Sequence, residues 1–487
     1  MAKRVAVIDI GSNSVRMVIY EKTSRFAFHL LYETKTKVRL SEDIYQNDGN
    51  LQEKPMQRAY EALKDFTTIV ESFKARKTLC VATSALRDAP NKKDFINKIK
   101  RDLKLNIKII DGEKESYFGA IACANLLVKQ EKALSVDIGG GSREFSIIND
   151  KDISNNISLH LGTVRLKELF FDKNKIDEAV KYIDKKLEIL NNLDINSIVG
   201  IGGTFRAIAI AIMKDQDYPI KKVHGFEFED KIFNNFIDKI LNADDNKLKS
   251  LYIKKNRFDI IKPGALILSR IMKKFKIKKI TASGVGVREG VYLSDLLRNS
   301  KDKMPHNYNT SVRYILDLHV EDLAYANQLS KLTKQLFDLT YNDLGLNKKY
   351  RKELSIASKL YTSGASMHFY TQYRHSYHLV SDALEYGFSH QEIILIATLV
   401  KYAGRKSPTT SHINKFESLL PKSDILNLLN YLLSISIALL SHRPKNLDFK
   451  LSFKDSVLKI ESKNSLYLMK DNLTSIDQAK EISIKVV

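Results

Sequence analysis

The first 300 residues alternate between short apolar runs and helical patterns. Apolar runs bounded by polar turns predict strands at residues 5–8, 15–20, 26–32, 78–82, 107–110, 133–138, 143–148, 197–201 and 279–282. Apolar positions at helical spacing predict helices at 53–75, 91–104, 175–192, 205–213, 263–275 and 291–297, and another that opens at residue 113. Strands that alternate with helices are typical of an α/β fold.

The pattern changes after a polar segment at residues 299–310, which we interpret as a linker. Beyond it the apolar spacing is helical over residues 311–341, 350–363, 376–386, 390–403 and 421–441. The last stretch, 445–487, alternates in LDFKLSF and VLKIES and predicts a small segment that contains strands. The chain therefore divides into an α/β part and a mostly helical part.

Two of the predicted turns share a sequence pattern. Residues 137–142 read DIGGGS between two apolar strands, and residues 9–14 read DIGSNS between two others. Successive glycines leave backbone N–H groups open to an anion, so we expect phosphate at both turns. A glycine-rich hairpin that is only a turn is the alternative for either copy, but a repeat of the D-I-G-x-x-S pattern indicates a duplicated fold.

Carboxylates stand beside these turns. Asp137 ends the strand before the glycines, and Glu144 follows Ser142 by two residues, on the same face of a strand. A carboxylate close to bound phosphate needs a cation such as Mg²⁺ to offset the repulsion. Glu113 and Glu115 fall in a first helical turn; we interpret Glu113 as a capping residue and Glu115 as a candidate base for activating water.

Further loops carry residues suited to binding phosphate. Arg87, in TSALRDAPN, is a candidate clamp because a guanidinium grips two oxygens, although a plain surface arginine is the alternative. Gly203 and Thr204 open a helix, where anions bind readily, and Arg288 lies in the glycine-rich loop SGVGVREG. Residues 157–167 (ISLHLGTVRLK) are interpreted as another polar loop, containing Gly162, Thr163 and Arg165.

Composition and charge indicate where the protein works and what kind of partner it binds. The net charge of +22 and pI near 9.5 favour a polyanion, while the sequence lacks zinc-finger and RNP patterns, so nucleic acid is not expected. No apolar run approaches the roughly 20 residues of a membrane span, and we expect a cytoplasmic protein without a membrane partner. Cys80 and Cys123 lie in apolar surroundings and are expected to be buried, reduced thiols.

Six motifs in one order carry a family resemblance. The two D-I-G-x-x-S hairpins, VATSALRDAPN, DGEKES, GIGGT and ASGVGVREG resemble those of the exopolyphosphatase/guanosine-pentaphosphate phosphatase (Ppx/GppA) family, within the actin-like (ASKHA, ribonuclease H-like) superfamily. The resemblance implies lobe I at residues 1–120, lobe II at 121–300, a helical domain similar to His-Asp (HD) phosphohydrolases at 301–444 and a small α+β segment at 445–487. It also implies a homodimer.

The resemblance also implies roles for single residues. Glu115 matches the general base, Asp137 and Glu144 match catalytic and metal carboxylates, and Asp9 matches the aspartate facing Mg²⁺. The positions that match the family's phosphate contacts are Asn13, Arg87, Gly139, Gly140, Gly141 and Ser142. The full set of predicted phosphate-binding residues also includes Gly11, Ser12, Ser14, Gly203, Thr204 and Arg288.

This chain departs from the family pattern in two places. Arg143 stands where the family commonly has Thr; because it points away from Ser142 and Glu144 on a strand, we expect little effect on catalysis. In the helical domain the usual His-Asp pair falls on Tyr361 and Thr362, and a later histidine falls on Ala403. We therefore expect no metal there, and we interpret five histidines of this domain as structural or surface residues: His319, His368, His375, His378 and His390.

The resulting hypothesis is a Mg²⁺-dependent hydrolase that removes a terminal phosphate from guanosine pentaphosphate, inorganic polyphosphate or both. Two alternatives remain. One is another ASKHA enzyme, a kinase or an actin-like ATPase; the other is a sensor that binds alarmone or polyphosphate without turnover.

Overall fold

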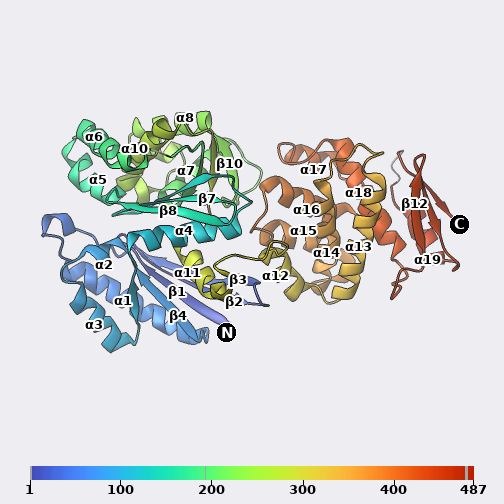
Figure 1. The fold of residues 1–487 in the computed structure, drawn as a ribbon, viewed down its shortest axis with the longest axis horizontal. Helices are drawn as coiled ribbons and strands as arrows, with labels where there is room; N and C mark the ends of the chain where they lie inside the picture. The colour runs from blue at the N-terminus through green and yellow to red at the C-terminus, as the bar shows by residue number, and fades with distance from the viewer. Residues whose placement is uncertain (1–2, 192, 478–480) are drawn as a thin grey trace. The chain divides into compact units, whose positions relative to one another are not determined.

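The computed structural model describes residues 3–191, 193–477 and 481–487, which form two compact units (Figure 1). The first unit spans Met1–Tyr308 and the second spans Asn309–Val487. The change of unit therefore falls inside the polar segment 299–310. All the predicted site residues belong to the first unit.

A five-stranded sheet forms the core of lobe I, in the order β3-β2-β1-β4-β5. Its strands are β1 (Arg4–Ile10), β2 (Val15–Lys22), β3 (Phe28–Thr36), β4 (Lys77–Ala82) and β5 (Ile107–Ile109). β1 pairs antiparallel with β2 and parallel with β4. The helices α1 (Glu53–Ser72), α2 (Ser84–Asp88) and α3 (Lys92–Leu103) complete the lobe, and buried Leu63, Phe66 and Phe95 join its core.

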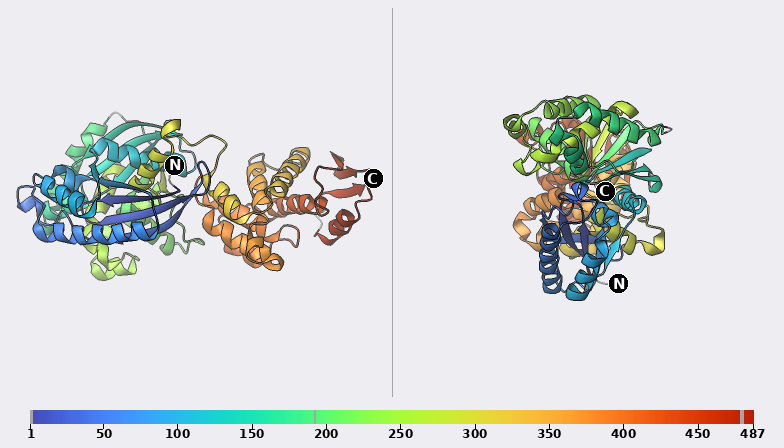
Figure 2. Two further views of the ribbon diagram at one scale, coloured as in Figure 1. Left: turned by 90° about the horizontal axis from the view of Figure 1, so that it is seen from below. Right: turned by 90° about the vertical axis from the view of Figure 1, so that its left-hand side faces the viewer.

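Lobe II repeats this topology. Its sheet has the order β10-β11-β9-β6-β7-β8, and β6 pairs antiparallel with β7 and parallel with β9, as β1 does with β2 and β4. The strands are β6 (Ala133–Ile138), β7 (Arg143–Asn149), β8 (Asp152–Leu159), β9 (Ser197–Ile201), β10 (Phe226–Glu229) and β11 (Lys279–Ala282). Its helices are α5 (Thr163–Leu169), α6 (Ile176–Leu187), α7 (Gly202–Asp215), α8 (Asp230–Leu241), α9 (Asp245–Ser250) and α10 (Phe258–Phe275). The predicted duplicated actin-like fold is confirmed (Figure 2, right).

Two helices lie between the sheets: α4 (Gly112–Leu126) and α11 (Val287–Leu296) (Figure 1). α4 is buried along most of its length, from Glu115 to Leu126. The helices come so close that a Cβ on Gly290 would lie 1.8 Å from the carbonyl oxygen of Phe118. This contact fixes the start of α4, with Glu115, relative to the start of α11, with Arg288.

Several boundaries differ from the sequence-based prediction. The loop expected at 157–167 is wrong for most of its length, because β8 continues to Leu159 and α5 begins at Thr163. α10 begins at Phe258 and includes Pro263 as an internal residue, so the proline does not mark the start of the helix; its missing N–H leaves one helical hydrogen bond unmade. The helix expected at 311–341 is two helices, with Asp322 accepting from the Tyr325 amide at 2.8 Å to cap the second.

The described residues of the second unit contain eight α-helices, of which seven come first: α12 (Thr310–His319), α13 (Leu323–Thr340), α14 (Tyr350–Leu360), α15 (Gln372–Ala383), α16 (His390–Tyr402), α17 (Thr410–Lys415) and α18 (Ser423–Leu439). The three-stranded sheet of β12 (Lys450–Lys454), β13 (Val457–Glu461) and β14 (Ser483–Val486) follows, with α19 (Tyr467–Ser475). A mostly helical domain with a small α+β tail is thus confirmed.

The residues at the expected HD positions do not form a metal site. Burial raises the pKa of the Tyr361 phenol to about 12. The backbone carbonyl of Tyr361 accepts a hydrogen bond from Ser376 Oγ at 3.0 Å. Of the five histidines, His390 is buried, His368 and His378 are exposed, and His319 and His375 are half-buried. Across 3–191, 193–477 and 481–487, no three His, Cys, Asp or Glu side chains are grouped as metal ligands.

Both cysteines are buried and free, as predicted. Burial raises the pKa of both thiols, that of Cys123 to about 12, so they stay protonated at neutral pH. Within the described ranges, no helix combines the length and apolar character that crossing a membrane requires.

Gly290→Ala tests the close contact between α4 and α11. The new methyl group would overlap the Phe118 carbonyl, so we expect a loss of about 1–3 kcal/mol in the free energy of unfolding. Gly119→Ala is the matched control on α4, since its Cβ would meet only Ile201 at 3.5 Å. Urea denaturation measures both; equal stability of the two variants would contradict the proposed packing.

Candidate active site

The two glycine hairpins lie against each other. A Cβ on Gly140 would be 3.3 Å from the Cβ of Ser12, and one on Gly141 would be 2.6 Å from Ser84 Oγ. The hydroxyls of Ser12 and Ser84 are 2.8 Å apart. Gly11 and Gly140 both line one cavity of about 150 Å³. The turns between β1 and β2 and between β6 and β7 therefore form opposite walls of a single cleft.

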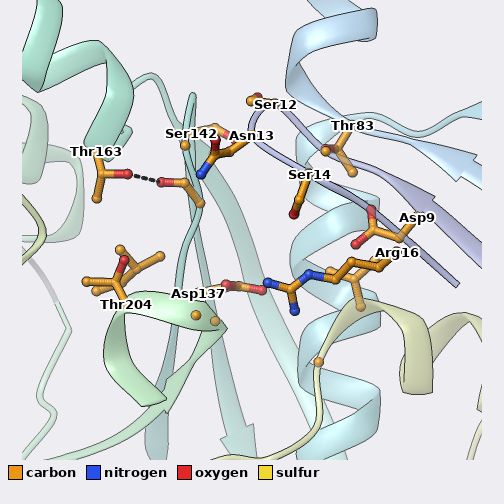
Figure 3. Close-up of a pocket in the computed structure, with 18 of the residues that line it drawn as sticks. Asp9, Ser12, Asn13, Ser14, Arg16, Thr83, Asp137, Ser142, Thr163 and Thr204 are labelled. Atoms are coloured by element: carbon orange, nitrogen blue, oxygen red, sulfur yellow. Dashed lines mark hydrogen bonds between the residues drawn. The ribbon is translucent and has the colours of Figure 1, made fainter. Parts of the chain in front are cut away.

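Most of the residues predicted from sequence line this cavity (Figure 3). They are Asp9, Gly11, Ser12, Asn13, Ser14, Glu115, Asp137, Gly139, Gly140, Ser142, Glu144, Gly203, Thr204 and Arg288. Two predicted phosphate contacts lie outside the lining: Gly141, which backs onto Ser84, and Arg87, which lies on α2 behind Glu115. The roles of all these residues remain predictions.

The start of α5 holds the loop 139–142, which we call the phosphate loop. The amide of Thr163 donates to the Gly139 carbonyl at 3.2 Å, and that of Val164 donates to the Gly140 carbonyl at 2.9 Å. Thr163 Oγ1 also donates to Gly139, as the dashed line in Figure 3 shows. Gly162 permits this approach, since a Cβ there would lie 1.9 Å from the Gly140 oxygen.

These bonds orient the loop's amides. In a trans peptide the N–H points opposite to the preceding C=O, so carbonyls turned toward α5 turn the Gly140 and Gly141 N–H groups the other way. Neither amide donates to a protein atom in the described part of the chain. The loop therefore offers two free N–H donors to an anion.

Glu115 and Glu144 form a coupled pair of buried carboxylates. Burial and the charge of Glu144 raise the pKa of Glu115 well above its usual range, while Arg87 opposes them through a 2.9 Å hydrogen bond. Burial and Asp137 raise the pKa of Glu144 to about 7, although Ser142 and Arg87 lower it. Ser158 Oγ donates to Glu144 at 3.1 Å. Such a pair can exchange a proton near neutral pH.

Asp9 and Asp137 face the cavity from the two lobes. Burial raises the pKa of both carboxyls. The charge of Asp9 raises the pKa of Asp137 further, while nearby arginines lower the pKa of both. Arg16 extends across the cleft toward Asp137 (Figure 3). Two carboxylates beside a phosphate site fit Mg²⁺, which commonly takes one or two protein carboxylates together with phosphate and water oxygens.

Sequence reasoning did not assign four basic side chains that line the cleft: Arg16, Lys35, Arg206 and Arg257. None of the four has a hydrogen bond or ion pair to another described residue. Burial, then neighbouring arginines, lowers the pKa of Arg16 to about 10 and that of Lys35 to about 8. Arg16 could have been predicted from the sequence, since it follows Ser14 by two residues at the start of β2. No sequence pattern marks Arg257 as a residue of the cleft.

A family profile matches most of the chain. Residues 18–299 match the Ppx/GppA phosphatase family, and residues 309–482 match domain III of the same family. The chain belongs to the Ppx/GppA phosphatase family. This membership confirms the resemblance carried by the six motifs and explains the arrangement of two glycine hairpins around one cleft.

Two curated relatives match the chain over different lengths. A bifunctional 3-dehydroquinate synthase/phosphatase of Fusobacterium nucleatum is 33% identical over 291 residues, which are 55% of this chain and 43% of that protein. A guanosine-5'-triphosphate,3'-diphosphate pyrophosphatase of Photobacterium profundum is 26% identical over 408 residues, 81% of this chain and 79% of that one. The chain thus spans less than half of the Fusobacterium protein.

Solved structures agree on the fold. The Ppx/GppA member of Aquifex aeolicus is 28% identical, with a TM-score of 0.54, and the match covers 62% of this chain and 99% of that one. An exopolyphosphatase of Cytophaga hutchinsonii, 24% identical, has a TM-score of 0.57 over 62% of this chain and all of that one, 100%. The second comparison shows the shared fold alone.

Arg87→Met tests the electrostatic control of Glu115. The guanidinium lowers the pKa of this carboxyl, so its removal raises the pKa further, and ionised Glu115 appears only at higher pH. We expect the acid limb of the phosphatase kcat/KM profile to move up by about one pH unit or more.

Arg101→Met is the control, because it removes an exposed arginine whose partner is Asp102, on the surface. Its profile should match that of the unsubstituted protein. An acid limb that stays in place in Arg87→Met would show that Glu115 does not set it.

Proposed function

We propose that this protein hydrolyses a phosphoanhydride bond, releasing the terminal phosphate of guanosine pentaphosphate, of inorganic polyphosphate, or of both. One observation carries the proposal: four basic side chains without protein partners face the cavity that holds the two glycine loops. Desolvating a cation is unfavourable unless an anion compensates it. A substrate with several phosphates supplies that compensation, whereas a neutral ligand does not.

Glu115 is the proposed general base. It opens α4 on the wall next to the phosphate loop, is 9% exposed, and holds its carboxylate against Arg87. In ionised form it would accept a proton from water as the water attacks the terminal phosphorus. Glu144, whose pKa lies near 7, is placed to share that proton.

Charge in the transition state builds up on the phosphoryl oxygens. The free amides of Gly140 and Gly141, together with Arg16 and Arg288, would stabilise it. Asp9 and Asp137 would hold Mg²⁺; Glu144, the third predicted ligand, is not grouped with them as a metal ligand in the described residues. When bound, the ion supplies charge neutralisation on the phosphate oxygens.

The cleft continues into a second basic cavity, which favours an elongated substrate. This neighbouring cavity of about 180 Å³ shares Asn13, Ser14, Lys35 and Arg257 with the first and adds Lys37. A phosphate chain fixed by its end at the loops would therefore meet further cations along its length. Polyphosphate and the 3′-diphosphate of guanosine pentaphosphate both fit this description.

The two alternatives make different predictions for one substrate panel. We expect phosphate release from polyphosphate or guanosine pentaphosphate to exceed release from ATP; preferential ATP hydrolysis would favour an actin-like ATPase. Glu115→Gln should lower kcat by about 10²–10⁴-fold with little change in substrate affinity. Tight binding without turnover by the unsubstituted protein would favour a sensor.

Lys35→Met tests the basic wall. Loss of one charge-assisted contact should raise KM for long-chain polyphosphate by about tenfold or more, because such a contact contributes about 1.5–3 kcal/mol. Lys175→Met is the control, since Lys175 is exposed, pairs with Glu178 at 2.9 Å and lines neither cavity. Similar KM values for the two variants would contradict a role for Lys35.

The same residue predicts a pH effect. Lys35 is protonated at pH 7 and loses its charge as the pH rises through about 8. KM of the unsubstituted protein should therefore rise above pH 8. Lys35→Arg, which stays charged, should remove that increase, and initial rates at several pH values measure it.

A further inference from the structure

Arg143 is the largest side chain with no exposure to solvent in the described chain. It is 0% exposed and points to the same face of β7 as Phe145, which belongs to the apolar core of lobe II. Glu144, between them, points to the opposite face, toward the cleft. An arginine inside an apolar core is unfavourable unless its polar atoms are used.

Its guanidinium contacts both ends of the phosphate loop. Nη1 donates to the Gly139 carbonyl at 2.9 Å and lies 3.4 Å from the Ser142 carbonyl. Nε and Nη2 have no hydrogen-bond partner in the described residues. Burial lowers the pKa of Arg143 to about 9, against the opposing effect of Glu144 and Asp137, so the group is still a cation at neutral pH.

The Gly139 carbonyl therefore accepts from two elements at once. Thr163 approaches it from α5, at 3.2 Å from its amide, and Arg143 approaches from β7, at 2.9 Å. Rotating the Gly139–Gly140 peptide toward the cleft would break both contacts and leave the buried guanidinium with only the longer, 3.4 Å contact to the Ser142 carbonyl. The rotation that would hide the Gly140 N–H from a phosphate is thus strongly opposed.

We propose that Arg143 is a positioning residue that locks the phosphate loop in its anion-binding conformation by holding the Gly139 and Ser142 carbonyls from behind. This inference rests on the proposed function, because it assumes that the loop binds phosphate. It replaces the expectation of little catalytic effect, which considered only the direction of the side chain. Threonine, common at this place in the family, is too short to reach both carbonyls.

The experiment compares Arg143→Met, Arg143→Lys and Arg143→Thr with the unsubstituted protein. Two quantities are measured: KM and kcat on the substrate cleaved best, and the affinity for tripolyphosphate by calorimetry. In Arg143→Met we expect tripolyphosphate affinity to fall and KM to rise by about tenfold or more, with a smaller change in kcat. Arg143→Lys, which keeps a charge and one donor, should recover part of both.

Phe145→Leu is the matched control. Phe145 is equally buried on the same strand but its side chain belongs to the apolar core, so this change should lower the Tm and leave KM and tripolyphosphate affinity unchanged. If Arg143→Met lowers the Tm but keeps both binding quantities within twofold, the proposal is overturned. If that variant does not fold, Arg143→Lys decides by the same two quantities.

The calorimetric measurement separates this inference from the proposed function. A protein that binds tripolyphosphate through Arg143-dependent loop geometry but cleaves no phosphoanhydride would overturn the hydrolase and retain the positioning role. Equal cleavage of the substrates with and without Arg143 would retain the hydrolase and overturn the positioning role.

Discussion

The cleft of the first unit depends on positive charge gathered in one cavity. Arginine and lysine side chains from both lobes converge on one cavity, and burial, together with their mutual repulsion, lowers the pKa of Lys35 and Arg16. Asp9, Asp137 and Glu289 offset part of this charge from within the protein. The remainder is an electrostatic imbalance that a polyanion removes on binding, and which would make phosphate-rich ligands stabilise the folded state.

Backbone geometry supplies the second part of the recognition. The phosphate loop is held by α5 and by Arg143, so the Gly140 and Gly141 N–H groups face away from α5 and have no acceptor in the described residues. Gly162 allows α5 to approach, and Gly202, at φ 86°, leaves room for the Asp137 carboxylate. Preorganised donors of this kind need no rearrangement when charge builds up on a phosphoryl group.

The carboxylates are placed by the packing of α4 against α11. Glu115 occupies the first turn of α4, and Gly290 lets α11 pass within contact distance of the Phe118 carbonyl. The same crossing brings Glu289 to the hydroxyl of Tyr20 on β2, at 2.6 Å. Glu115 and Glu289 are therefore both positioned by the crossing of α4 and α11.

The sequence alone determined the duplicated α/β fold and most of the cleft's lining, because glycine turns after apolar strands are local signals. The pattern D-I-G-x-x-S marks both turns whatever surrounds them, and Glu115 is marked by a capped helix start. Arg257 and Arg206 were not predicted, since the sequence pattern around a charged residue in a loop or helix is the same whether its side chain meets solvent or a cavity. Arg143 and Arg87 were placed by tertiary structure: strand alternation gives a direction, but only the packing of β7, α5 and α4 shows which carbonyl or carboxylate lies at its end.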